Sequence, residues 1–296
     1  MGEAKVHKEC HGPVAVLTLD APPVNSFSLS LRLQLYSALQ WAAATECVKA
    51  VVLTGSGRGF SAGGDIREFG TARASAAPGL SSHIHLAIEQ LGKPVIAAVH
   101  GFAMGGGLET SLACHYRVAE QGTVLGLPEV SLGTLPLSAT QRLPRVLGIV
   151  PAVQFMIEGH QKTVSEFSHT ALFDRIVDPG QGLSTACALA TELVAMPPSN
   201  EELQQRLIRH WAIPGTDIQR DLAEARQCLS GRQDAASRSL FEAVEAGASL
   251  SDFDAGMDCA RRLYDQLMAG DEILRGRDRF LESAPENRPR VDPAAP

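Results

Sequence analysis

Two glycine-rich segments are the parts of this sequence whose composition is best suited to chemistry. The first occupies 60–66 and the second 101–109, and each follows a run of apolar residues. Because glycine has no side chain, a ligand can approach the backbone closely at such positions. The second segment also opens a predicted helix, whose free N–H groups and dipole favour negative charge. Two converging N–H groups from separate loops are what an enolate or a tetrahedral oxyanion needs.

Each segment taken singly is also compatible with a plain tight turn, because glycine is the default turn residue. A third glycine-rich stretch, Gly55 to Phe60, invites comparison with a dinucleotide-binding turn. That fingerprint requires another glycine where Phe60 stands, and no convincing acidic residue follows about 20 residues later. We therefore exclude a dinucleotide site at this turn.

Composition narrows the classes of partner. The 296 residues carry a net charge of -7 without a basic stripe, so we expect no nucleic-acid partner. Six cysteines are scattered without a C-x-x-C pair, which fits neither a zinc site nor a disulfide framework. The N-terminus lacks the apolar core of a signal peptide, and no apolar run approaches the roughly 20 residues of a membrane span. We expect free thiols, no metal, no membrane partner and a cytoplasmic location.

Apolar runs set out the expected fold. Those at 14–19, 50–54 and 95–99 predict three buried strands, with a helical run at 108–114 after the second glycine segment. Further short strands are predicted at 116–119 and 123–125, and later helices at 186–196, 201–211, 218–229, 254–268 and 272–282. Strands that alternate with helices in the first half predict an α/β core with a helical C-terminal region.

We divide the chain into three parts on this basis. The core covers 1–195 and the helical C-terminal region covers 196–282. The remaining 283–296 are proline-rich and polar, which predicts a disordered tail.

Several separate motifs follow one another in order along the chain. They read PPVN at 22–25, SAGGDI at 61–66, KPVIAAV at 93–99, GGGLE at 105–109, LPEV at 127–130, TQRLPR at 140–145 and DRIV at 174–177. In this order and spacing they resemble the enoyl-CoA hydratase/isomerase (crotonase) family, most closely the hydratase domain of bifunctional enoyl-CoA hydratase/3-hydroxyacyl-CoA dehydrogenases. The resemblance is strong over about 14–177. The sequence shows no dehydrogenase part, so no NAD chemistry is expected.

The resemblance implies a fold, an assembly and a set of site residues. The fold would be a spiral of ββα turns capped by helices, assembled as a homotrimer or a pair of trimers. The oxyanion N–H groups would be those of Gly64 and Gly106, and the catalytic carboxylates those of Glu109 and Glu129. The acyl-CoA would be lined by Gly64, Asp65, Ile66, Arg67 and Gly106, with Arg58 or Arg67 at its phosphates. Coenzyme A is then part of the substrate, and no separate cofactor is expected.

The implied reaction is hydration of a 2-enoyl-CoA, as in fatty acid β-oxidation. Glu109 would act as base toward the water and Glu129 as acid toward C2. The sequence departs from the family at 136–140, which is one residue shorter and lacks the glycines of a loop that helps to hold the water. Two other functions therefore stay open. A Δ3,Δ2-enoyl-CoA isomerase needs only one carboxylate to shuttle a proton, and a crotonase-fold protein could bind acyl-CoA without turnover.

Overall fold

The computed structural model describes residues 4–282 and contains two β-sheets. The larger sheet has the strand order β1-β2-β3-β4-β6-β9, and the smaller has the order β5-β7-β8. The strands are β1 Lys5–His11, β2 Val14–Asp20, β3 Ala50–Gly55, β4 Val95–Val99, β5 Phe102–Met104, β6 Tyr116–Glu120, β7 Val124–Gly126, β8 Lys162–Thr163 and β9 Arg175–Val177. β1 pairs antiparallel with β2, as β7 does with β8, and the other neighbours are parallel.

The central strands are buried on both faces. Every residue of β3 and β4 is buried, and alternate side chains enter different cores. Val51 and Leu53 join the larger core, whereas Val52 joins a smaller core on the opposite face. A continuous apolar run is typical of a parallel strand covered on both faces. The predicted strands at 14–19, 50–54 and 95–99 are thus confirmed.

The edge strand β1 was missed by sequence reasoning. Its sequence KVHKECH has no apolar run, and only Val6 of the strand is buried. It pairs with β2 along its full length, from Lys5 opposite Asp20 to His11 opposite Val14. Charged residues on an exposed edge are typical, because they discourage pairing with another sheet. This strand is therefore defined by its partner rather than by its own pattern.

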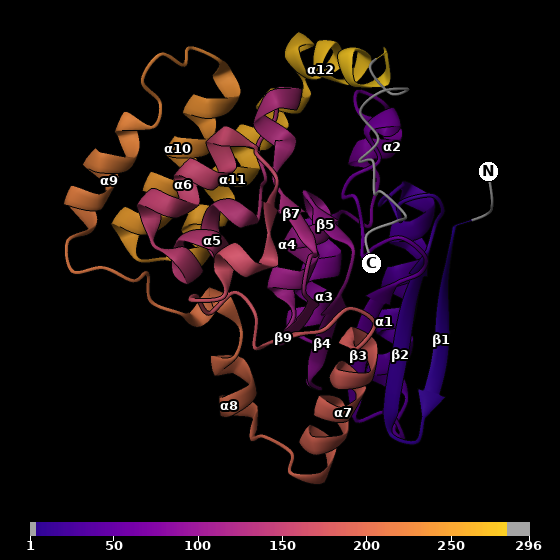
Figure 1. The fold of residues 1–296 in the computed structure, drawn as a ribbon. Helices are drawn as coiled ribbons and strands as arrows, with labels where there is room; N and C mark the ends of the chain where they lie inside the picture. The colour runs from indigo at the N-terminus through magenta and orange to yellow at the C-terminus, as the bar shows by residue number, and fades with distance from the viewer. Residues whose placement is uncertain (1–3, 283–296) are drawn as a thin grey trace.

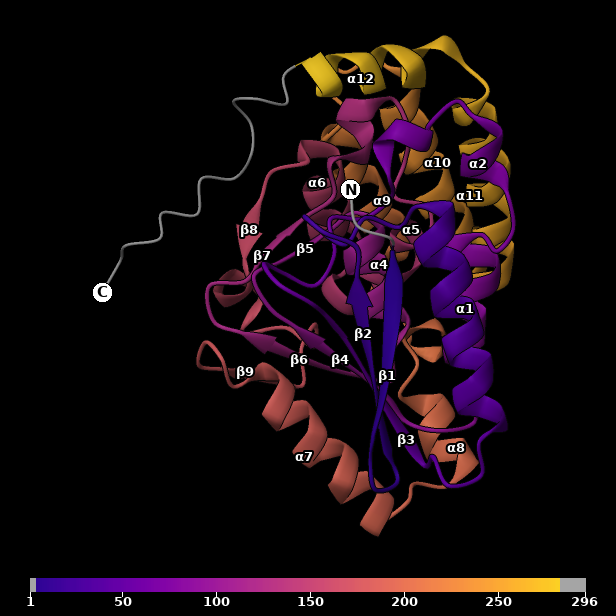
Figure 2. The same ribbon diagram turned by 90° about the vertical axis from the view of Figure 1, so that its right-hand side faces the viewer.

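Helices cover both faces of the larger sheet. In Figure 2, α7 lies on one side of the sheet and α1 on the other. The helices are α1 Leu29–Ala44, α2 Ala72–Ser75, α3 Leu86–Glu89, α4 Gly106–Ala113, α5 Ala139–Leu147, α6 Ile149–Glu158, α7 Gly182–Ala195, α8 Asn200–Gln205, α9 Ile218–Gln227, α10 Ala235–Leu250, α11 Phe253–Met268 and α12 Asp271–Glu282. Single turns occur at η1 Ile66–Glu68, η2 Leu80–His85, η3 Pro128–Leu132, η4 Val164–Phe167 and η5 Ile208–His210. The predicted α/β core with a helical C-terminal region is confirmed.

The C-terminal helices fold back onto the core. Helices α10 and α11 form a hairpin that lies beside α5 and α6 (Figure 1). Glu89 binds Arg142 at 2.5 Å and Arg209 at 3.0 Å, and Arg209 in turn binds Asp254 at the start of α11. The ring of Phe253 lies 5.1 Å from the guanidinium carbon of Arg142. These contacts fix the position of α11, one face of which reaches the cavity described below.

No helix within residues 4–282 combines the length and the apolarity that a bilayer crossing requires. The predicted tail at 283–296 lies outside the described residues.

Candidate active site

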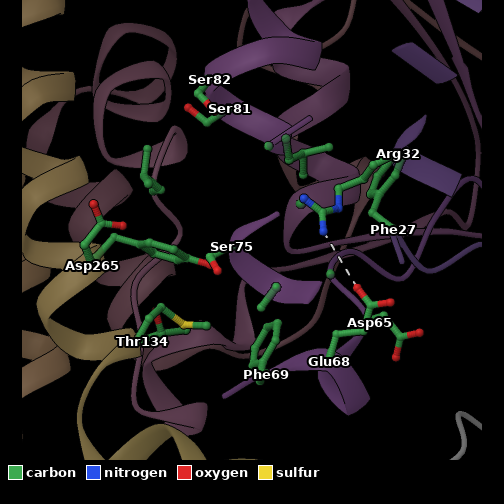
Figure 3. A pocket seen from close by; sticks show the side chains of 18 of the residues that line it. Phe27, Arg32, Asp65, Glu68, Phe69, Ser75, Ser81, Ser82, Thr134 and Asp265 are labelled. Atoms are coloured by element: carbon green, nitrogen blue, oxygen red, sulfur yellow. Dashed lines mark ion pairs between the residues drawn. The ribbon is translucent and has the colours of Figure 1, made fainter. Parts of the chain in front are cut away.

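One cavity, of about 830 Å³, opens where the first turn of α4 meets η3, the segment 64–85 and α11. Figure 3 shows Arg32, Asp65 and Glu68 on one side of it and Asp265 on the other. Five of the predicted site residues line it, namely Gly64, Asp65, Gly106, Glu109 and Glu129. The structure therefore brings both glycine segments and both glutamates to one place.

The backbone N–H groups of Gly64 and Gly106 lie close together. A Cβ built on Gly106 would stand 3.5 Å from the nitrogen of Gly64. Gly63, at φ +85°, lets the two loops touch, because a Cβ there would stand 2.9 Å from the nitrogen of Gly106. Within residues 4–282, neither N–H donates to an acceptor. Two free donors this near each other can bind one oxygen that carries developing negative charge.

Gly105 places Glu129 beside this pair of donors. Its backbone, at φ +50°, is in the region that favours glycine. A Cβ there would stand 2.4 Å from Oε1 of Glu129, so a larger residue would displace the carboxyl group. Glu129 follows Pro128 at the start of η3, and its Oε2 is buried without a partner within the described residues.

Glu109 lies in the first turn of α4 with one oxygen fully occupied. Its Oε1 accepts hydrogen bonds from the Ser138 N–H at 2.6 Å, the Ser138 hydroxyl at 3.0 Å and the Ala139 N–H at 2.9 Å. Within residues 4–282 the hydrogen bonds to this carboxylate all end on Oε1, and none ends on Oε2. The residue is 7% exposed and lines the cavity, so Oε2 is the atom available to a ligand.

The 136–140 segment lies against Glu109 and the cavity. Its Leu137 lines the cavity. Ser138, however, is turned onto Glu109 and is fully buried. Sequence reasoning missed this contact, because no local pattern says which carboxylate a serine will meet.

The two glutamates hold their protons unequally. Burial and the charge of Glu109 raise the pKa of Glu129 well above its usual range. Burial also raises the pKa of Glu109, but the hydrogen bonds from Ala139 and Ser138 oppose this increase. The hydrogen bonds stabilise charge on Glu109, and Glu129 receives none from a neighbouring residue within the described part of the chain, so the singly protonated pair favours the proton on Glu129. The site then contains one carboxylate base and one carboxylic acid.

Helix α11 supplies the wall that sequence reasoning missed. Arg261, Tyr264, Asp265 and Met268 line the cavity at helical spacing along one face. Burial, with the charge of Glu109, raises the pKa of Tyr264 to about 12, so its hydroxyl stays protonated. The spacing was visible in the sequence, but nothing in it indicated that this face would meet Glu109.

Some of the residues predicted to contact the coenzyme line the cavity and others do not. Asp65 lines the cavity, and its carboxylate binds Arg67 through bonds of 2.8 Å and 2.7 Å. Ile66, Arg67 and Arg58 are not among the lining residues. Arg32 donates to the carbonyls of 73, 76 and 78 and lies 3.7 Å from Glu68, which holds this loop over the cavity. The predicted contacts of Arg58 and Arg67 with phosphates stay predictions.

Known proteins share this arrangement of sequence and fold. The family model for enoyl-CoA hydratase/isomerase matches residues 9–209. A probable enoyl-CoA hydratase of Bacillus subtilis (strain 168) is 37% identical over 191 residues, 62% of this chain and 74% of that protein. The peroxisomal bifunctional enzyme of Homo sapiens is 39% identical over 170 residues, 57% of this chain. Its match spans only 23% of the human enzyme's length.

Among solved structures, an enoyl-CoA hydratase from Mycobacterium avium subsp. paratuberculosis shares the fold. It superimposes with a TM-score of 0.70 at 20% identity, covering 95% of this chain and 97% of that one.

Proposed function

Because the chain belongs to the enoyl-CoA hydratase/isomerase family, we propose that it adds water across the 2,3 double bond of a 2-enoyl-CoA thioester. One observation carries this proposal. Oε1 of Glu109 is held by Ser138 and Ala139, so Oε2 alone faces the cavity, beside a glutamate that keeps its proton. A base, an acid and a pair of free N–H donors are the three parts that this addition needs.

The thioester oxygen would bind the N–H groups of Gly64 and Gly106. As water attacks C3, electrons move through C2 to that oxygen, and the two donors stabilise the resulting enolate. Each such donor is worth about 100- to 1000-fold in kcat. The dipole of α4, which begins at Gly106, adds to the stabilisation.

The two glutamates transfer protons in opposite directions, since one takes a proton from water and the other gives one to the substrate. Oε2 of Glu109 takes a proton from the attacking water as the bond from oxygen to C3 forms. Glu129 delivers its proton to C2, which completes the 3-hydroxyacyl-CoA. Glu109 then carries the proton and Glu129 the charge, so one proton must return to Glu129 before the next cycle. The higher pKa of Glu129 drives that return.

Substitution of the acid tests the proposal. Glu129→Gln should lower kcat for crotonyl-CoA hydration by about 100- to 10,000-fold, since the amide cannot donate a proton to C2. Glu201→Gln, at an exposed carboxylate on α8, is the matched control and should leave the rate unchanged. Loss of absorbance of the enoyl thioester measures the rate. Undiminished turnover by Glu129→Gln would contradict the assignment.

Δ3,Δ2-enoyl-CoA isomerisation is the second candidate. The same Ser138 contact is compatible with it, because the one oxygen left to Glu109 is enough to move a proton between C4 and C2. Conversion of a 3-enoyl-CoA without hydration of a 2-enoyl-CoA would support this candidate. Binding of acyl-CoA with neither reaction would indicate a binding protein.

Three further expectations accompany the proposal. We place the reaction in fatty acid β-oxidation and the protein in the cytoplasm, and we expect a homotrimer or a pair of trimers. Sedimentation velocity of the purified chain measures its assembly, and a monomer at micromolar concentration would contradict the trimer.

A further inference from the structure

Arg261 lies in the cavity wall with its charge uncompensated. Within residues 4–282 no carboxylate lies at ion-pair distance from it and it makes no hydrogen bond. Its recorded neighbour is the ring of Tyr264, whose centroid lies 5.8 Å from the guanidinium carbon. The other arginine of the wall, Arg32, donates instead to three carbonyls. A half-buried guanidinium with open N–H donors is suited to a planar anion, which it binds through two parallel hydrogen bonds.

The guanidinium of Arg261 acts on His85, which also lines the cavity. Its charge is among those that lower the pKa of His85, after burial and Arg142. His85 is 1% exposed, and its Nε2 lies 3.1 Å from the hydroxyl of Thr110 on α4. Arg142 is already bound to Glu89, so Arg261 is the cation there that still lacks a partner within the described residues.

The two sides of the cavity suit different parts of a thioester. A thioester whose oxygen is bound at Gly64 and Gly106 sends its coenzyme arm one way and its acyl chain the other. Asp65 and Glu68 line one side, where the coenzyme arm is expected, and Asp265 of α11 lies across from them (Figure 3). With the coenzyme arm on that side, the acyl chain would run toward α11. Asp265 is exposed to water and forms no ion pair with Arg261 within residues 4–282.

We propose that Arg261 binds a carboxylate at the far end of the acyl chain, so that the preferred substrates are 2-enoyl-CoA thioesters with an ω-carboxylate. This inference rests on the proposed function, whose chemistry it leaves unchanged. Tyr264 supports the guanidinium with its ring, and its neutral hydroxyl adds a donor on the same face. An alkyl chain would instead leave the guanidinium without an acceptor, which disfavours its binding.

The test compares an ω-carboxy-2-enoyl-CoA with its methyl ester at six, eight and ten acyl carbons. The selectivity is the ratio of kcat/KM for the acid to that for the ester. The wild-type chain should favour the acid by at least about tenfold at one length, and Arg261→Met should lower the ratio by about 10- to 100-fold. Arg261→Lys keeps the positive charge but cannot make the two parallel hydrogen bonds of a guanidinium, and it should lower the ratio less. Arg262→Met is the matched control, since Arg262 pairs with Glu242 away from the cavity.

Calorimetric titration separates this inference from the proposed function. Saturated ω-carboxyacyl-CoA and its methyl ester report the same selectivity in binding, even if the chain hydrates nothing. Hydration with a ratio near one in the wild-type chain, or a ratio that Arg261→Met does not change, overturns the role of Arg261 alone. Equal loss for acid, ester and free coenzyme A would assign the arginine to the phosphates and also overturn it.

Discussion

Ser138 binds Oε1 of Glu109 twice, through its N–H at 2.6 Å and its hydroxyl at 3.0 Å. The contact joins the start of α5 to the first turn of α4, and it leaves Oε2 as the free atom of the carboxylate. Ser138, which lies in the segment where the resemblance leads us to expect glycines, thus supports the base. The hydroxyl stabilises the ionised form of Glu109, because it donates to the carboxylate.

Ser138→Ala removes the hydroxyl and keeps both N–H donors. The pKa of Glu109 should rise, since one hydrogen bond to its charged form is lost. The acid limb of the pH profile of kcat/KM should therefore move to higher pH, with a several-fold loss of rate below it. Ser131→Ala is the control, because that exposed hydroxyl bonds within residues 4–282 to the carbonyl of Pro128 alone. An unshifted limb in Ser138→Ala would refute the contact's effect on the base.

Glu129→Gln should stabilise the fold at neutral pH while it lowers the rate of hydration. The folded state raises the pKa of Glu129 above its ordinary value of 4.5, so its contribution to stability is full below pH 4.5 and is lost as pH rises through the folded pKa. The amide avoids this loss, and we expect a gain of about 1 kcal/mol or more near pH 7. Urea unfolding from pH 4 to 8 measures it. The difference in the free energy of unfolding between the variant and the wild-type chain should disappear toward pH 4. A difference that does not change with pH would show that the raised pKa of Glu129 is not its cause.

Gly105→Ala should damage the site more than the fold. The new Cβ would displace the carboxyl of Glu129, and the positive φ adds strain of about 1–3 kcal/mol. Gly92→Ala is matched, since Gly92 has φ +69° and nothing within 4 Å of a built Cβ. Both variants should lose similar stability in thermal unfolding, but only Gly105→Ala should lose kcat. Equal kcat in the two would show that Glu129 does not depend on Gly105.

Glu89→Gln should destabilise the chain strongly. It removes the charge that neutralises Arg142 and Arg209, and a buried cation left unpaired costs about 3–5 kcal/mol. Arg226→Ala breaks the exposed pair with Glu245 and should cost less than about 1 kcal/mol. The midpoint of urea unfolding distinguishes the two. A small effect of Glu89→Gln would mean that α11 is held by its apolar contacts alone.

The sequence allowed prediction of those parts of the fold that produce a recognisable pattern within a short stretch of residues. Buried parallel strands such as β3 are continuous apolar runs, and the glycines at 63, 64, 105 and 106 indicate close backbone approach. Edge strand β1 and the contact of Ser138 with Glu109 depend on partners distant in sequence, so no window of residues shows them. The same holds for α11, whose helical spacing was predictable although its place against the cavity was not.

The match to the family model ends at residue 209, whereas the cavity wall continues to 269. Glu109 and Glu129 thus lie inside the matched stretch, whereas Arg261, which we propose binds the end of the acyl chain, lies outside it. Phe253 and Asp254 anchor the start of α11, and the face of this helix that lines the cavity lies beyond them. Exchange of this helix between related proteins should therefore change the preference for an acyl group and leave the catalytic residues as they are.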